Sequence, residues 1–119
     1  MANHGERQSH IGFIEKIKPL QQKGTRIFVI PGNHDINIPD SKKYIGETPQ
    51  PTENVSADEF VQLYTSFGYA DALKCDTASL SYLAEIDAKT WLLSFDVNRY
   101  AEYKTTSLSG GRVLTQTME

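Results

Sequence analysis

Three adjacent polar residues, Asn33, His34 and Asp35, follow a short apolar run and a Pro-Gly pair. The amide oxygen of Asn33 can bind a hard or borderline divalent cation without adding negative charge. His34 can bind a metal, donate to a phosphate oxygen or act as an acid near neutral pH. Asp35 can accept the other ring N–H of His34, which would fix the tautomer and the orientation of the ring. The alternative is an ordinary Pro-Gly-Asn turn with local hydrogen bonds.

Hydrophobic periodicity predicts the elements that position these residues. Residues 5–23 predict an amphipathic helix, with Ile11, Ile14 and Ile17 on one face. Residues 25–30 are β-branched and almost continuously apolar, which predicts a central strand covered on both faces. In open α/β sheets, ligands bind beyond the carboxyl ends of the strands. The three polar residues are therefore expected at the ligand-binding edge of a sheet.

A long loop and a second helix are predicted next. Residues 36–55 are rich in proline and glycine, and loops of this length are usually functional or mobile. Ser56 and Glu59 have the spacing of a capping box, in which each side chain bonds the other residue's backbone N–H. Apolar residues at helical spacing follow, and Gly68 is expected to end the helix.

The last third of the chain predicts an antiparallel hairpin. Residues 79–86 and 90–97 alternate apolar and polar positions and are joined by a short turn. Residues 112–119 have the composition of the first turns of a helix. Because the first helix has no strand before it and the last has none after it, we expect 1–119 to be a single partial domain. Its class would be an incomplete α/β fold of helix, strand, loop, helix and β-hairpin.

The sequence Gly32-Asn33-His34-Asp35 after an apolar strand resembles the third signature of the calcineurin-like metallophosphoesterases. HGERQSH resembles the NGE…SH stretch that follows this family's second signature. Four later segments resemble those of bacterial members: SADEFVQLYTSFGYADAL, SLSYLAEI, TWLLSFDVNRY and GGRVLTQTME. The resemblance implies a layered α/β sandwich in which two divalent ions activate a water that hydrolyses a phosphate ester. It implies that Asn33 binds one metal ion, that His34 contacts the phosphate or protonates the leaving group, and that Asp35 steadies His34.

The sequence also departs from the family pattern. The Asp-x-His signature is absent, the Gly-Asp signature would lie upstream of Met1, and the Gly-His-x-His signature would lie beyond Glu119. One neutral amide oxygen cannot hold two dications, so we expect the isolated chain to be inactive and to lack a bound metal pair. In the full-length parent, the pair would be of the Mn, Fe, Zn or Mg class. The substrate would be a phosphate ester, with monoesters, diesters and nucleotides equally compatible.

Other functions remain open at this point. The chain could be a non-catalytic scaffold that self-associates through exposed sheet edges, or a nucleotide binder with one metal ion or none. A net charge of −3 and the lack of a Lys/Arg stripe argue against a nucleic-acid surface. No apolar run is long enough to span a membrane, and no signal peptide is recognisable, so the localisation is left open.

Two histidines and the single cysteine have ordinary interpretations. His4 and His10 are expected to be solvated at the start of a helix. The alternative is that they recruit a metal ion. Cys75 is expected to be a small buried apolar filler.

Further candidates lie in the second half of the chain. Asp96 and Asn98 are interpreted as strand-end or turn caps, although they could lie at the same edge as His34. Residues 109–111 predict a loop-to-helix junction, or else an anion-binding nest. Trp91 is expected in the core or at its rim.

Overall fold

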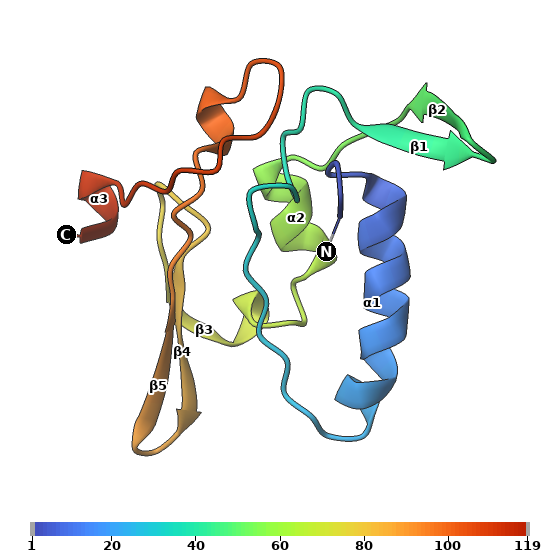
Figure 1. Cartoon of the computed structure of the whole chain (residues 1–119). Helices are drawn as coiled ribbons and strands as arrows, with labels where there is room; N and C mark the ends of the chain where they lie inside the picture. The colour runs from blue at the N-terminus through green and yellow to red at the C-terminus, as the bar shows by residue number, and fades with distance from the viewer. Residues whose placement is uncertain (1, 119) are drawn as a thin grey trace.

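The computed structural model describes residues 2–118 and contains both helices and antiparallel sheets (Figure 1). The chain measures 51 × 38 × 19 Å, and its radius of gyration is 15.2 Å, compared with about 13.5 Å for a compact domain of this length. It is therefore a flat, slightly extended α+β unit. Its elements are α1 (Arg7–Gln22), β1 (Lys42–Ile45), β2 (Thr48–Pro51), α2 (Ala57–Leu63), η1 (Tyr69–Asp71), β3 (Ala72–Cys75), β4 (Tyr82–Asp87), β5 (Thr90–Ser94), η2 (Tyr100–Glu102) and α3 (Thr115–Met118).

Helix α1 confirms the prediction made from apolar spacing. Phe13, Ile14 and Ile17 pack against the core, and the opposite face is exposed. The helix continues through Pro19, and the chain leaves it at Gly24, whose φ of +93° suits a residue without a Cβ.

Residues 25–30 do not form a paired strand, so the predicted central strand is wrong. The segment runs between α1 and the β3–β5 sheet in Figure 1. Val29 N–H donates to Phe67 O at 2.9 Å, and Tyr82 Oη donates to Val29 O at 2.9 Å. A ladder needs a regular row of backbone groups on the neighbouring strand. Here the backbone of Val29 is bonded instead by one loop carbonyl and one tyrosine hydroxyl, so no ladder forms.

The predicted loop 36–55 contains a hairpin that the sequence interpretation missed. Strands β1 and β2 pair from Lys42↔Pro51 to Ile45↔Thr48 and project from the body in Figure 1. Gly46, with φ +62°, lies in the tight turn. The prolines in β2 are tolerated because an isolated two-stranded ribbon consists only of edges.

Helix α2 forms with the predicted capping box. Ser56 Oγ accepts from Glu59 N–H at 3.2 Å, and the Glu59 carboxylate accepts from Ser56 N–H at 2.9 Å. The helix ends at Leu63, earlier than expected, and a turn leads to Gly68. Gly68 has φ +121°, and a Cβ there would lie only 2.9 Å from Tyr82 Cζ. The glycine is therefore required both by its backbone conformation and by its close packing.

The three-stranded sheet has the order β3-β4-β5, with both pairs antiparallel. The β4–β5 hairpin was predicted, whereas β3 was not, because its four residues follow an irregular stretch. On the inner face, Tyr82 and Ala84 are buried. On the outer face, Trp91 is 67% exposed and Leu93 is 54% exposed. The expectation that Trp91 lies in the core or at its rim is therefore wrong.

The core lies between the two longer helices, the extended segment 25–30 and the inner face of the sheet. Aromatic side chains fill most of it, with Phe60 and Tyr64 at a ring-centroid separation of 4.5 Å. Cys75 is exposed and is not part of the core, contrary to prediction, because β3 is an edge strand. The buried cluster comprises Val29, Ile36, Val55, Phe60, Tyr64, Phe67, Tyr69, Tyr82 and Ala84.

Candidate functional site

Residues 31–36, called the Asn33 turn below, are closed by the side chain of Asp35. Its Oδ2 accepts from Gly32 N–H at 2.8 Å, and its Oδ1 accepts from Ala2 N–H at 2.7 Å. Asp35 N–H in turn donates to Gly32 O at 3.1 Å. The side chain is buried, with 3% of the residue exposed. Asp35 therefore fixes the backbone of the turn and links it to the N-terminal segment.

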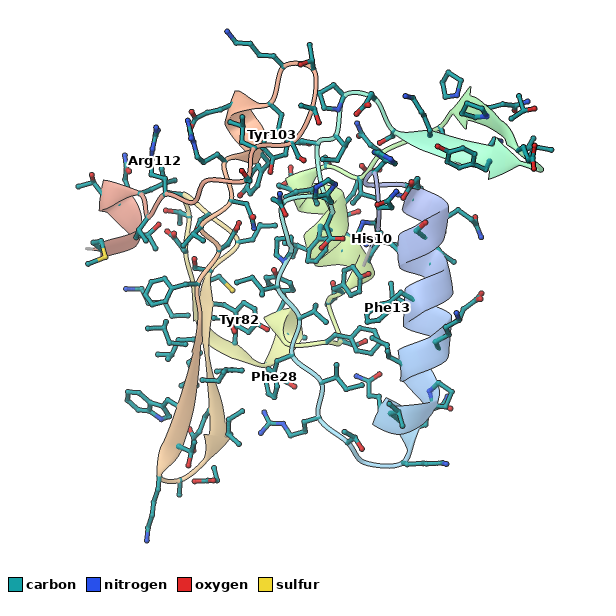
Figure 2. The ribbon with its side chains drawn as sticks, viewed as in Figure 1. His10, Phe13, Phe28, Tyr82, Tyr103 and Arg112 are labelled. Carbon is teal, nitrogen blue, oxygen red and sulfur yellow. The ribbon has the colours of Figure 1, made fainter. Side chains whose placement is uncertain are left out.

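His10 supports the same turn from below. It is fully buried, with Nε2 at 2.7 Å from Asp35 O and Nδ1 at 2.9 Å from Tyr64 Oη. Because a carbonyl can only accept, Nε2 carries the proton and Nδ1 accepts from the Tyr64 hydroxyl. Burial lowers the pKa of His10 and raises that of Tyr64. The ring is therefore neutral and structural. Figure 2 labels His10.

The prediction of a solvated His10 is wrong. The spacing of His10 from the apolar residues of α1 could have predicted its burial. His10, Ile14 and Ile17 are spaced as i, i+4 and i+7, which places the histidine on the apolar face of α1. Both ring nitrogens already have protein partners, which leaves neither available for a metal ion in this conformation. His4 is half-buried, and its ring lies 6.5 Å from that of His34.

His34 lies on the opposite, solvent-facing side of the Asn33 turn. Its Nδ1 lies 2.8 Å from Asn3 O, and its Nε2 lies 3.2 Å from Ser107 Oγ. The carbonyl partner requires a proton on Nδ1, so the neutral ring accepts from the Ser107 hydroxyl through Nε2. Asp35 therefore acts on His34 through the backbone of the turn, whereas a direct contact with the ring had been expected.

Asn33 is half-buried between the turn and a distant loop. Its Nδ2 donates to Leu108 O at 3.3 Å, and its backbone O accepts from Tyr103 Oη at 3.0 Å. The Leu108 contact orients the amide and leaves Oδ1 as the group suited to a cation. Within residues 2–118, no three His, Cys, Asp or Glu side chains are grouped to hold a metal ion. The described residues therefore do not fit a metal pair.

Asp96 and Asn98 connect the end of β5 to the Asn33 turn. Asp96 Oδ2 accepts from Leu80 N–H at 3.1 Å, and its Oδ1 accepts from Asn98 N–H at 3.0 Å, which confirms the predicted capping. Asn98 Nδ2 also donates to Pro31 O at 2.7 Å. Asn98 thus reaches the Asn33 turn and helps to hold it in place, and Asp96 orients Asn98 through a bond from Asn98 Nδ2 at 2.8 Å.

Residues 109–111 do not join a helix directly. Arg112 N–H donates to Val97 O at 2.8 Å, and the chain stays irregular until α3 begins at Thr115. A Cβ on Gly111 would lie 3.1 Å from a methyl carbon of Val97. The glycine allows two backbone segments to pack closely here.

A groove of about 220 Å³ lies between α3 and the outer face of the β3–β5 sheet. Leu83, Leu93 and Phe95 contribute apolar wall, and Lys74 and Thr117 contribute polar groups. None of the residues that line it belongs to the Asn33 turn. It is a separate, mainly apolar feature and is not part of the polar site.

No protein-family model matches the sequence, and no curated protein matches it. Over residues 2–118, no helix has the length and apolar character needed to cross a membrane.

Proposed function

We propose that this chain contributes the asparagine–histidine–aspartate turn of a calcineurin-like metallophosphoesterase site that hydrolyses phosphate esters. The observation that carries the proposal is the two-sided construction of the Asn33 turn. Asp35 and His10 hold it from inside, whereas the side chains of Asn33 and His34 lie on the outer side. Polar groups that are fixed before a ligand arrives are the most effective at stabilising the charge that develops on it during a reaction. For the complete domain, we propose the layered α/β sandwich of that family.

His34 is the residue that meets the phosphate in this proposal. Because Nδ1–H is held by Asn3 O, protonation of the ring places the second proton on Nε2. That N–H can donate to a phosphate oxygen or protonate the leaving group. In a complete site Asn33 would offer its amide oxygen to one divalent ion, and Asp35 keeps both side chains in place through the backbone.

The metal centre requires ligands beyond the described residues. A pair of divalent ions of the Mn, Fe, Zn or Mg class would supply an activated water in a complete site. Reading the coding sequence on both sides of this chain tests this part of the proposal. In-frame Asp-x-His and Gly-Asp signatures upstream and a Gly-His-x-His signature downstream would support it, and their absence would contradict it.

Binding of inorganic phosphate to the 119-residue chain tests the role of the turn. We expect millimolar phosphate to shift the side-chain NMR signals of His34 saturably, and His34→Ala to weaken binding, while the chain hydrolyses no aryl phosphate with Mn²⁺ present. Lack of any response at the turn would overturn the proposed phosphate role. Metal-dependent hydrolysis by the chain alone would overturn the claim that the site is incomplete.

A second candidate function is self-association through β5. This strand lies at the edge of its sheet, contains no charged residue or proline, and carries Trp91 and Leu93 exposed on one face. Natural edge strands are usually protected by such residues or by bulges. An antiparallel pairing of two copies about Leu92 would place Trp91 opposite Leu93 with no like charges in contact. The occupant we propose for this edge is therefore a second copy of the chain.

Light scattering during size-exclusion chromatography tests this second candidate. We expect a dimer that Trp91→Lys converts to a monomer, because a buried lysine opposes pairing. Thr48→Lys, on the exposed strand β2, is the matched control and should leave the dimer intact. A wild-type monomer at all accessible concentrations would refute the pairing.

A further inference from the structure

Both outward side chains of the Asn33 turn are contacted by one segment from the other end of the sequence, residues 103–108. Tyr103 Oη donates to Asn33 O at 3.0 Å, and Asn33 Nδ2 donates to Leu108 O at 3.3 Å. Ser107 Oγ lies 3.2 Å from His34 Nε2. We call residues 103–108 the strap. It touches the two residues to which the proposed chemistry is assigned.

The strap belongs to a loop whose ends are fixed. Arg99 pairs with Glu102 through two hydrogen bonds, of 3.1 and 2.6 Å, and Arg112 pairs with the same carboxylate at 3.1 Å. The bond from Arg112 N–H to Val97 O closes the base. The segment between Val97 and Arg112 has the size of an Ω-loop, roughly 6–16 residues. Such compact loops are frequently functional. Figure 2 shows Tyr103 within this loop and Arg112 at its far end.

The middle of the strap has few attachments. Lys104, Thr105 and Thr106 are exposed, and none of their side chains makes a hydrogen bond among those described. Local segments with few buried contacts open at low free-energy cost. Movement of Ser107 away from His34 therefore requires loss of one hydroxyl contact, whereas the bonds of Asn33 to Tyr103 and Leu108 can stay in place.

The contacts of the strap have different chemical consequences for the two residues. The Leu108 carbonyl fixes the Asn33 amide so that Oδ1, the atom suited to a cation, points away from the strap. Ser107, in contrast, occupies Nε2 of His34, the nitrogen that must reach a phosphate oxygen. The Leu108 contact positions Asn33 for binding, and the Ser107 contact covers His34.

We propose that the strap is a gate for the His34 imidazole: Ser107 covers Nε2 until a phosphate group displaces it, while Leu108 keeps the Asn33 amide oriented. Tyr103 and Leu108 are then positioning residues for the turn, and Ser107 is the group that the ligand must displace. This inference rests on the proposed phosphate role of His34. It adds that the chain itself competes with the ligand for that nitrogen.

NMR of the ligand-free chain tests whether the strap contact exists in solution. We expect Ser107→Ala to move the Nε2 resonance of His34 by several parts per million, because the ring loses its donor. Thr106→Ala, the exposed neighbour, is the matched control and should leave it unchanged. Tyr103→Phe should speed hydrogen exchange of the Asn33 side-chain amide by loosening the strap. Equal His34 resonances in wild type, Ser107→Ala and Thr106→Ala would overturn the gate.

Titration with inorganic phosphate separates the gate from the proposed function. If Ser107 competes with phosphate, Ser107→Ala should tighten phosphate binding about 2- to 10-fold, which is the net strength of one hydrogen bond. Thr106→Ala should not change it. Unchanged or weaker binding in Ser107→Ala would overturn the gate even if wild type binds. If no form of the chain binds phosphate, the proposed function fails, and the ligand-free His34 resonances still decide whether the strap covers Nε2.

Discussion

The two sides of the Asn33 turn differ in burial and in the role of their histidines. On the inner side, His10 is fully buried and has both ring nitrogens bonded to Asp35 and Tyr64. On the outer side, His34 is exposed and contacts Asn3 and a hydroxyl of the strap. The comparison teaches that the same residue type serves as fixed support on one side and, on the other, as a ring that a ligand can reach once Ser107 is displaced. Environment, rather than residue identity, separates the two roles.

Asp35→Asn should break the inner side most severely. The carboxylate accepts two backbone N–H groups in a buried setting, and an amide in its place would direct a donor at one of them. Charge-assisted hydrogen bonds of this kind contribute about 1.5–3 kcal/mol each, so we expect the free energy of unfolding to fall by about 2–4 kcal/mol. Urea denaturation measures it. A loss as small as that of a surface substitution would show that Asp35 does not hold the turn.

Tyr64→Phe should have an intermediate effect. It removes the hydroxyl that donates to His10 Nδ1 and leaves a buried acceptor without its donor. We expect a loss of about 1–2 kcal/mol in the free energy of unfolding. Tyr103→Phe is the matched change on the outer side, where water can replace the lost hydroxyl, and it should cost less than about 1 kcal/mol. Equal losses in the two variants would erase the proposed contrast between the sides.

The inner side should also make stability depend on pH. Burial lowers the pKa of His10 below its ordinary value of 6.5, so below that pH the unfolded chain binds more protons than the folded one. Stability from the neutral ring is therefore complete above pH 6.5 and is lost as the pH falls through the folded pKa.

Denaturation between about pH 5.5 and 6.5 tests this contribution, because the stabilising interactions of Glu59 and Glu102, whose pKa values are lowered from 4.5, are lost mainly below that window. His34→Ala should keep the same decline. A flat profile in wild type would contradict a buried neutral His10.

Substitution of His34 itself should have the smallest effect on stability. Its ring is exposed, and its two contacts are with groups that water can satisfy equally well. We expect His34→Ala to change the free energy of unfolding by less than about 0.5 kcal/mol while weakening phosphate binding. A large loss of stability would mean that the outer side also supports the fold.

The sequence predicts the features that depend on nearby residues. The capping box of Ser56 and Glu59, the helix α1 and the β4–β5 hairpin are local patterns, and all three form. Partners far along the chain were not predictable. Residues 25–30 look like a strand, but their neighbours are a carbonyl of Phe67 and a hydroxyl of Tyr82.

The same distinction applies to the candidate site. Asn33, His34 and Asp35 are recognisable from one short motif, and the structure places them on one turn. The strap contacts, by contrast, join residues more than sixty positions apart, and no periodicity reports them. The role of Asp35 as a backbone clamp also depends on a long-range contact, with Ala2, which lies 33 positions away.

A crystal structure of the chain soaked with orthovanadate, a phosphate mimic, tests the central claim most directly. The account predicts the anion within hydrogen-bonding distance of His34 Nε2, with Ser107 displaced and the bonds of Asp35 and His10 unchanged. An anion bound elsewhere, or an Asn33 turn that rearranges to bind it, would contradict the claim that a turn fixed from inside presents Asn33 and His34 to a phosphate group.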